Sequence, residues 1–145
     1  MSVSPCATDA EILATYPVMR QLRPHLASPE AYLRQVREIM AAHGFSLLGC
    51  FRDGVCVGVA GYTIETRLHR GKVLYVADLV TDSAARSTGV GRELLTALRE
   101  TARTAGCTAV VLDSGTQRLE AHSFYFREGF RITAFNFHCA VSGAA

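Results

Sequence analysis

The sequence predicts an α/β fold in which one central, twisted, mixed sheet carries helices on both faces. Three observations lead to this prediction. Stretches with helical periodicity alternate along the chain with β-rich runs, two of those runs flank a strong hairpin signal, and a glycine-rich loop joins a strand-like run to an amphipathic helix. The 145 residues suit one domain, and because no repeat, low-complexity tract or linker interrupts them, we expect a single domain over residues 1–145.

A capping box at Thr8-Asp9-Ala10-Glu11 predicts the start of the first helix. Pro17 is expected to kink or restart this helix before Leu22, because proline lacks the N–H that a helix interior needs. Only Ser2–Cys6 can supply a strand before this helix. The sequence therefore does not decide which segment forms the first edge of the sheet.

The second helix has clear signals at both ends. Ser28 is a typical N-cap and Pro29 suits the first helical position, while Gly44 is expected to end the helix. Apolar side chains recur on one face between these ends: Tyr32, Leu33, Val36, Ile39 and Met40.

Asp53-Gly54 predicts a hairpin turn between two strands, Phe45–Arg52 and Val55–Ile64. A third strand is expected from about Lys72 to Thr81.

The glycine-rich loop that follows is Arg86-Ser87-Thr88-Gly89-Val90-Gly91. Its glycines fall on the first turn of the next helix, where main-chain N–H groups have no partner within the helix. These free donors, the helix dipole and the charge of Arg86 together predict a phosphate-binding site. The helix itself is indicated by apolar residues at helical spacing: Val90, Leu94, Leu95, Leu98 and Ala102.

The remaining elements follow in short order. Gly106 is expected to end the phosphate-binding helix, and Ala109–Asp113 reads as a short buried strand. We expect a helix over Gln117–Arg127 and, after Gly129, a last strand over Phe130–Cys139.

Two other phosphate-binding glycine motifs are alternatives for this loop. A P-loop is excluded, since no Gly-Lys-Ser/Thr follows the glycines. A dinucleotide fingerprint is closer, because Asp113 lies near the expected distance of about 20 residues. However, Leu94 replaces its third glycine, the polar segment Asp82–Thr88 is too long for its tight turn, and too little sequence follows Asp113.

Two separate motifs resemble those of the GNAT superfamily of acyl-CoA-dependent N-acyltransferases. Leu79-Val80-Thr81 and the loop after it are similar to the superfamily's pyrophosphate motif, R/Q-x-x-G-x-G/A after a central strand. The second motif, N-x-x-A-x-x-F-Y-x-x-x-G-F, is matched by Arg118, Ala121, His122, Phe124, Tyr125, Gly129 and Phe130. The resemblance covers roughly residues 45–139, and Arg118 departs from it where the superfamily often has Asn.

The resemblance implies an acetyl-CoA cofactor (CoA after transfer). Leu79, Val80 and Thr81 would bind pantetheine through main-chain atoms, with an N–H near Leu79 or Val80 polarising the acetyl carbonyl. The pyrophosphate would lie against Arg86, Ser87, Thr88, Gly89, Val90 and Gly91. Arg118 either contacts the cofactor or points into solvent.

The resemblance also implies that Tyr125 protonates the thiolate of coenzyme A. The pKa values of a phenol, about 10, and a thiol, about 8.5, are close enough for this transfer. A base must also deprotonate the amine, and Asp78 is the first candidate, since a carboxylate in an apolar strand needs a partner or a role. Glu65 is the second candidate and His122 the third, while a packing role for Tyr125 and a structural ion pair for Asp78 stay open.

Composition limits the remaining classes. With 49% hydrophobic and 19% charged residues and a net charge of +2, the chain resembles an ordinary globular protein and has no basic patch for nucleic acid. Its longest apolar stretch, Val55–Tyr62, is far below the roughly 18 residues of a membrane span, and the N-terminus lacks signal-peptide character, so we expect a cytoplasmic protein. No histidine or cysteine spacing indicates a metal. We expect free thiols and small core residues at Cys6, Cys50, Cys56, Cys107 and Cys139.

The predicted function is therefore an acetyltransferase that transfers acetyl from acetyl-CoA to a small-molecule or peptide amine by direct attack in a ternary complex. Alternatives are an acyl-CoA sensor with little turnover and, more distantly, a dinucleotide-dependent oxidoreductase. By the same resemblance, acceptors would contact Arg23, Pro24, His25 and the loop Glu65–Gly71. Neither the acceptor nor a homodimer follows from the sequence.

Overall fold

The computed structural model describes residues 1–143. They fall into two compact units, with the boundary between Leu112 and Asp113.

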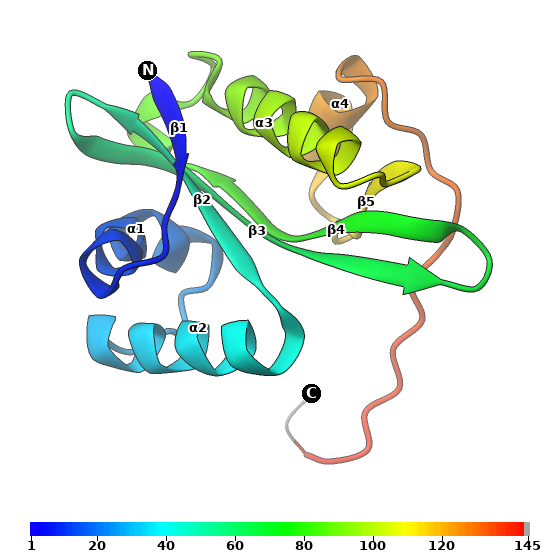
Figure 1. Cartoon of the computed structure of the whole chain (residues 1–145), viewed down its shortest axis with the longest axis horizontal. Helices are drawn as coiled ribbons and strands as arrows, with labels where there is room; N and C mark the ends of the chain where they lie inside the picture. Colours follow the sequence, from blue (N-terminus) through cyan, green and yellow to red (C-terminus); the bar gives the residue numbers. More distant parts are fainter. Residues whose placement is uncertain (144–145) are drawn as a thin grey trace. The chain divides into compact units, whose positions relative to one another are not determined.

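The first unit contains a five-stranded sheet whose order follows the chain (Figure 1). Neighbouring strands are antiparallel, except that the fourth and fifth are parallel, so the predicted mixed sheet is confirmed. The N-terminal segment does supply the first edge strand. The strands are β1 (Ser2–Pro5), β2 (Ser46–Arg52), β3 (Val55–Arg67), β4 (Gly71–Thr81) and β5 (Ala109–Leu112).

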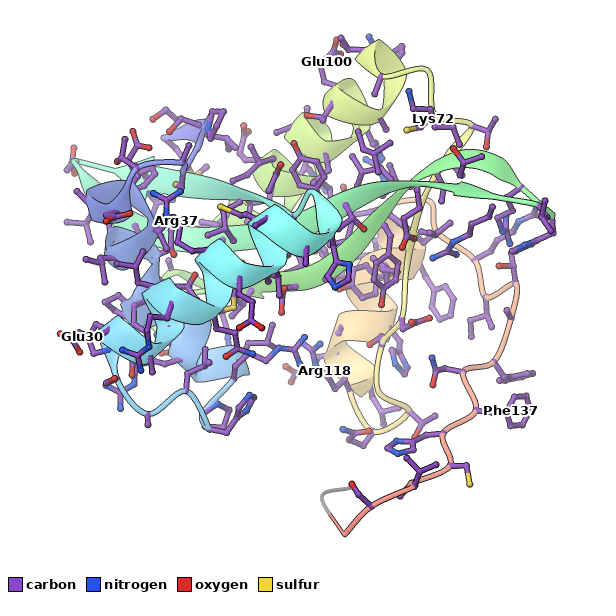
Figure 2. The ribbon with its side chains drawn as sticks, turned by 60° about the horizontal axis from the view of Figure 1, so that its bottom comes forward. Glu30, Arg37, Lys72, Glu100, Arg118 and Phe137 are labelled. Carbon is purple, nitrogen blue, oxygen red and sulfur yellow. The ribbon has the colours of Figure 1, made fainter. Side chains whose placement is uncertain are left out.

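Helices cover both faces of this sheet (Figure 1). α1 (Asp9–Leu22) and α2 (Pro29–His43) lie on one face, and α3 (Val90–Thr104) lies on the other. Figure 2 shows Arg37 on α2, where its Nε donates to Oδ1 of Asp9 on α1 at 3.0 Å and so links the two helices.

The capping box at the start of α1 is confirmed. The Glu11 N–H donates to Thr8 Oγ1 at 3.2 Å, and the Thr8 N–H donates back to the Glu11 carboxylate at 2.9 Å. The prediction that Pro17 interrupts the helix is wrong in one respect, since α1 runs unbroken to Leu22. Pro17 removes only one main-chain hydrogen bond, and buried side chains on both sides of it, Tyr16, Val18 and Met19, hold the helix on the sheet.

The ends of α2 and the hairpin also follow the sequence signals. Ser28 Oγ accepts the Ala31 N–H at 3.1 Å, and Gly44 ends α2 with a φ of 64°. Asp53 and Gly54 both have positive φ, 52° and 76°, which is the backbone of the tight turns that match the twist of a hairpin.

At the end of α3, the Gly106 N–H donates to Arg103 O and the Cys107 N–H to Ala102 O. With Gly106 at a φ of 76°, this is a Schellman ending, and the prediction that Gly106 ends the helix is confirmed.

α3 packs closely on β3 because residue 58 is glycine. A Cβ placed on Gly58 would lie only 2.4 Å from Val90 Cγ1 and 3.0 Å from Leu94 Cδ1. We therefore expect Gly58→Val to reduce the free energy of unfolding by about 1–3 kcal/mol, the usual cost of overpacking. Urea denaturation measures this change. Gly143→Val is the control, since nothing lies within 4 Å of that position, and equal stability of the two variants would contradict the packing role of Gly58.

In the described part of the second unit, residues 113–143, the helix is α4 (Leu119–Arg127), which begins two residues later than predicted. Gly129 follows it with a φ of 87°. The predicted strand Phe130–Cys139 is wrong: residues 130–143 form neither strand nor helix. A strand needs a neighbouring strand to bond its main chain. The large apolar side chains of this segment after Phe130 are exposed, namely Ile132, Phe135 and Phe137, the last of which is labelled in Figure 2.

Within residues 1–143, no helix is long and apolar enough to cross a membrane. The same residues contain no group of three or more His, Cys, Asp or Glu side chains that is able to hold a metal ion.

Candidate functional site

The glycine-rich loop presents main-chain donors at the start of α3. Ser87 and Gly89 both have positive φ, 62° and 90°, and Gly89 is the N-cap residue. Glycine has no side chain to cap the helix, so no N-cap side chain bonds the first-turn amides. Such amides after left-handed residues form concavities that bind anions.

Side chains around the loop add positive charge and rigidity. The exposed guanidinium of Arg86 forms no ion pair within residues 1–143. The Thr88 hydroxyl donates a hydrogen bond to Ala85 O within the loop. The same hydroxyl accepts a hydrogen bond from Arg52 Nη2 at 3.2 Å. Arg52, at the end of β2, is a second guanidinium beside the loop that sequence reasoning missed.

The entry to the loop is bound to α1. Gln21 Nε2 donates to Asp82 Oδ1 at 2.8 Å, and Gln21 Oε1 accepts the Ser83 N–H at 2.9 Å. One side chain thus connects the helix nearest the predicted acceptor region to the predicted phosphate loop.

Beyond Val76, no strand within residues 1–143 pairs with β4 on the side of β5. β5 pairs with β4 only over Val73–Val76, whereas β3 continues to pair up to Thr81. A bulge at Ala77 separates the two parts, because Gly61 pairs with Asp78 and Tyr62 with Val76.

The direction of each main-chain group beyond the bulge follows from one hydrogen bond. The Asp82 N–H donates to Val57 O at 2.8 Å, so this opposite pair is a hydrogen-bonded pair. Because such pairs alternate along antiparallel strands, Val80 bonds to β3, whereas Leu79 and Thr81 direct their N–H and C=O groups to the open edge. Val90, by contrast, offers the loop only its main chain, since its side chain is buried in the core.

Asp78 lies beside this open segment and pairs with Arg23. Its Oδ1 accepts a hydrogen bond from Arg23 Nε at 3.0 Å and forms an ion pair with Nη2 at 2.9 Å, while Nη2 donates a hydrogen bond to Ala77 O. The Asp78 side chain is 16% exposed, and its second oxygen, Oδ2, has no hydrogen-bond partner in the described part of the chain. The ion pair left open by the sequence is therefore present, and one carboxylate oxygen remains available.

Asp78 and Arg23 line a cavity of about 300 Å³ between α1, α2 and the sheet. Tyr32, also in the lining, shares a 2.7 Å hydrogen bond with Thr15, and burial raises the pKa of Tyr32 to about 12, so its phenol stays neutral. The remaining lining residues are Met19, His25, Leu26, Gln35, Val36, Ile39, Phe45 and Leu47.

The other base candidates have partners elsewhere. Glu65 is bound to Arg67 at 2.8 Å, opposite Val73 on β4, and does not line the cavity. His122 Nε2 lies 2.8 Å from Gly115 O, which requires that nitrogen to carry the proton.

Tyr125 belongs to α4 in the second unit and is buried. The rings of Phe124 and Phe130 lie 5.5 and 5.6 Å from its ring, measured between centroids. Burial raises the pKa of Tyr125 and Arg118 opposes that shift, so the phenol is protonated near neutral pH. Arg118 is the N-cap residue of α4 but provides no side-chain cap.

All five cysteines are free thiols, and three of them are core residues as predicted. Burial raises the pKa of Cys56 to about 11 and also raises those of Cys6 and Cys50, so none of the three is suited to be a nucleophile. The prediction of a core position is wrong for Cys107, which is half-buried, and for Cys139, which is exposed on the irregular C-terminal segment.

Comparisons with known proteins show the family of this chain. The model of the acetyltransferase (GNAT) family matches residues 11–130. An uncharacterized N-acetyltransferase of Bacillus subtilis, YhdJ, is 35% identical over 88% of this chain and 89% of its own. An aminoglycoside N(6')-acetyltransferase of Stenotrophomonas maltophilia is 27% identical over 84% of this chain and 91% of its own.

Solved structures share the fold. A Trypanosoma brucei acetyltransferase superposes with a TM-score of 0.79 at 23% identity, covering 97% of this chain and 99% of its own. The aminoglycoside N-acetyltransferase AAC(6')-Iy, solved with CoA, gives 0.78 at 19% identity, with 95% of each chain covered.

Proposed function

Because the chain belongs to the acetyltransferase (GNAT) family, we propose that it acts as a single domain that transfers acetyl from acetyl-CoA to a primary amine by direct attack in a ternary complex. The family model spans both compact units, which supports a single domain. The proposal rests on the order of residues in β4. Asp78 lines the cavity and has one carboxylate oxygen without a hydrogen-bond partner among the described residues, and it is followed directly by Leu79, whose main-chain groups point to the open edge.

The residues present suit acetyl-CoA. The main-chain donors of Ser87, Gly89, Val90 and Gly91, together with Arg86 and the Thr88 loop, would hold the pyrophosphate. Leu79 and Thr81 would bond the pantetheine amides through their open main-chain groups, while Val80 holds the strand in place. When bound there, acetyl-CoA supplies an acetyl thioester.

Three groups of the chain would then act on the reacting atoms. Asp78, directly or through a water, takes the proton that the ammonium group must lose before its nitrogen attacks the acetyl carbon, and the second proton of that nitrogen leaves to water as the C–N bond forms. The Leu79 N–H donates to the acetyl carbonyl oxygen, where negative charge develops. Tyr125 gives its proton to the sulfur released as the C–S bond breaks, and exchange with water restores both protonation states. We assign Arg118 a supporting contact to the cofactor.

Acetyl-CoA and CoA are expected to stabilise the protein more than NAD(H) or ATP do, because the loop suits a pyrophosphate joined to pantetheine. At a hundredfold excess over Kd the gain is about 2.7 kcal/mol, a rise of several degrees in Tm by differential scanning fluorimetry. Gly91→Val should remove most of this rise by crowding the phosphate path, whereas Thr96→Val, an exposed change on the same helix, should keep it. Equal stabilisation by all of these compounds would contradict the proposal, since it would show that the loop binds anions without selecting coenzyme A.

A further inference from the structure

We propose that the acceptor is a small primary amine with an apolar body and a single positive charge, selected by the cavity between α1, α2 and the sheet. This inference rests on the proposed function and adds the class of substrate to it.

The cavity wall is predominantly apolar. Six aliphatic or aromatic side chains supply most of it: Met19, Leu26, Val36, Ile39, Phe45 and Leu47. At about 300 Å³ the cavity is at the small end of ligand sites, so it accommodates a compact apolar group rather than an oligosaccharide.

The charges in the cavity nearly cancel. Among the described residues that line the cavity, only Asp78 is acidic, and Arg23 is already hydrogen-bonded to it. A polycation would therefore find one carboxylate that is partly neutralised. A phosphate would find Arg23 with Nε and Nη2 both engaged, and it would also face the negative charge of Asp78.

Few polar groups are left for the hydroxyls of a sugar. The Tyr32 hydroxyl is bonded to Thr15, which leaves the side chains of Gln35 and His25. Sugar hydroxyls enclosed here would lose their water without regaining hydrogen bonds, at a cost for each unpaired group.

One ammonium group does have a place. Asp78 Oδ2 lies over Gly61, where a Cβ would come within 2.8 Å of that oxygen and 2.3 Å of the Phe45 ring. The missing side chain at residue 61 lets this oxygen and the Phe45 ring lie close to the β3 main chain. No described residue donates a hydrogen bond to Oδ2, and Asp78 directly precedes Leu79, where main-chain groups turn to the open edge. An amine at Oδ2 with its apolar body among the side chains of α1 and α2 satisfies both charge and burial.

The names of some relatives state acceptors of a different chemical class. They include glucosamine 6-phosphate and aminoglycoside N-acetyltransferases, whose acceptors are respectively phosphorylated and polycationic. The comparison of these acceptors with apolar amines is therefore decisive.

The experiment measures kcat/KM for straight-chain primary amines of two to six carbons, for 2-phenylethylamine, for glucosamine 6-phosphate and for kanamycin, at saturating acetyl-CoA. Burial of each added methylene should raise kcat/KM by about fourfold until the cavity is filled. The best apolar amine should exceed the sugar phosphate and the aminoglycoside by more than about tenfold. A flat chain-length series, or a preference for either polar acceptor, overturns the substrate class while leaving the acetyltransferase in place. Absence of turnover on every amine overturns the proposed function as well.

Filling the cavity supplies the matched test. Ile39→Trp occupies the apolar wall, so it should lower kcat/KM for the long amines at least about tenfold and shorten the optimal chain. Val55→Trp adds the same side chain at an exposed position and should change neither. Stabilisation by CoA, measured on both variants, reports an intact fold and cofactor site, and an unchanged chain-length optimum in a CoA-binding Ile39→Trp protein overturns the assignment.

Discussion

Tyr125→Phe is expected to lower kcat by about a hundredfold to ten-thousandfold while the affinity for acetyl-CoA stays nearly unchanged. The substitution removes one hydroxyl and keeps the ring that contacts Phe124 and Phe130. Within residues 1–143 that hydroxyl has no hydrogen-bond partner, so its loss should break no structural contact. Steady-state rates on any accepted amine, together with CoA calorimetry, measure the two quantities.

A packing role for Tyr125 predicts another result, namely modest destabilisation with nearly normal turnover. Tyr62→Phe is the control, since it removes a hydroxyl from a half-buried tyrosine of β3 that has no proposed role. Because burial raises the pKa of Tyr125, its phenol should stay protonated throughout the neutral range, so the effect of Tyr125→Phe should be visible across that range. Wild-type rates in Tyr125→Phe at every pH would remove it as the acid.

The parts of the fold that the sequence predicted have causes within a few residues. Short segments define three of these features: the Thr8 capping box and the Ser28 N-cap by local hydrogen bonds, and the Asp53-Gly54 turn by its positive φ angles. The left-handed Gly89 at the start of α3 is of the same kind. Such features can be predicted from the sequence because neighbouring residues determine them.

The strand predicted over Phe130–Cys139 fails for the opposite reason. Alternation of apolar residues favours a strand, but whether another strand lies beside it is a tertiary fact. Pro17 is similar, since packing of α1 outweighs the local preference against proline. In both places tertiary structure overrides a local signal.

In the candidate site, too, local signals were visible in the sequence and contacts between distant residues were not. Asp78 was singled out from its position in the strand, but its partner Arg23 lies 55 residues away, and Arg52 lies 36 residues from Thr88. No local pattern joins these residues. The cavity and the free oxygen of Asp78 likewise emerge only when α1, α2, β3 and β4 are assembled.

Asp78→Asn is the second change expected to have a large effect. The amide has nearly the shape of the carboxylate, and its oxygen can still accept from Arg23, but it cannot take a proton from the amine. We expect kcat/KM at neutral pH to fall by about a hundredfold to ten-thousandfold, the usual contribution of a general base. The fall should shrink as pH rises, because more of the amine is then already neutral in solution.

Arg23→Gln separates this role from a structural one. It removes the partner of the ion pair and keeps the carboxylate, so an Asp78 that acts as the base should retain the wild-type shape of its pH–rate profile in this variant. If Asp78 only positions Arg23, the two variants should lose similar activity and neither should change the pH dependence. Profiles of kcat/KM from pH 6 to 10, with CoA binding as a measure of intact structure, distinguish the two. Near-normal activity of Asp78→Asn at pH 6 would exclude Asp78 as the base, since almost all of the amine is protonated there and the reaction then depends most on a group that accepts its proton.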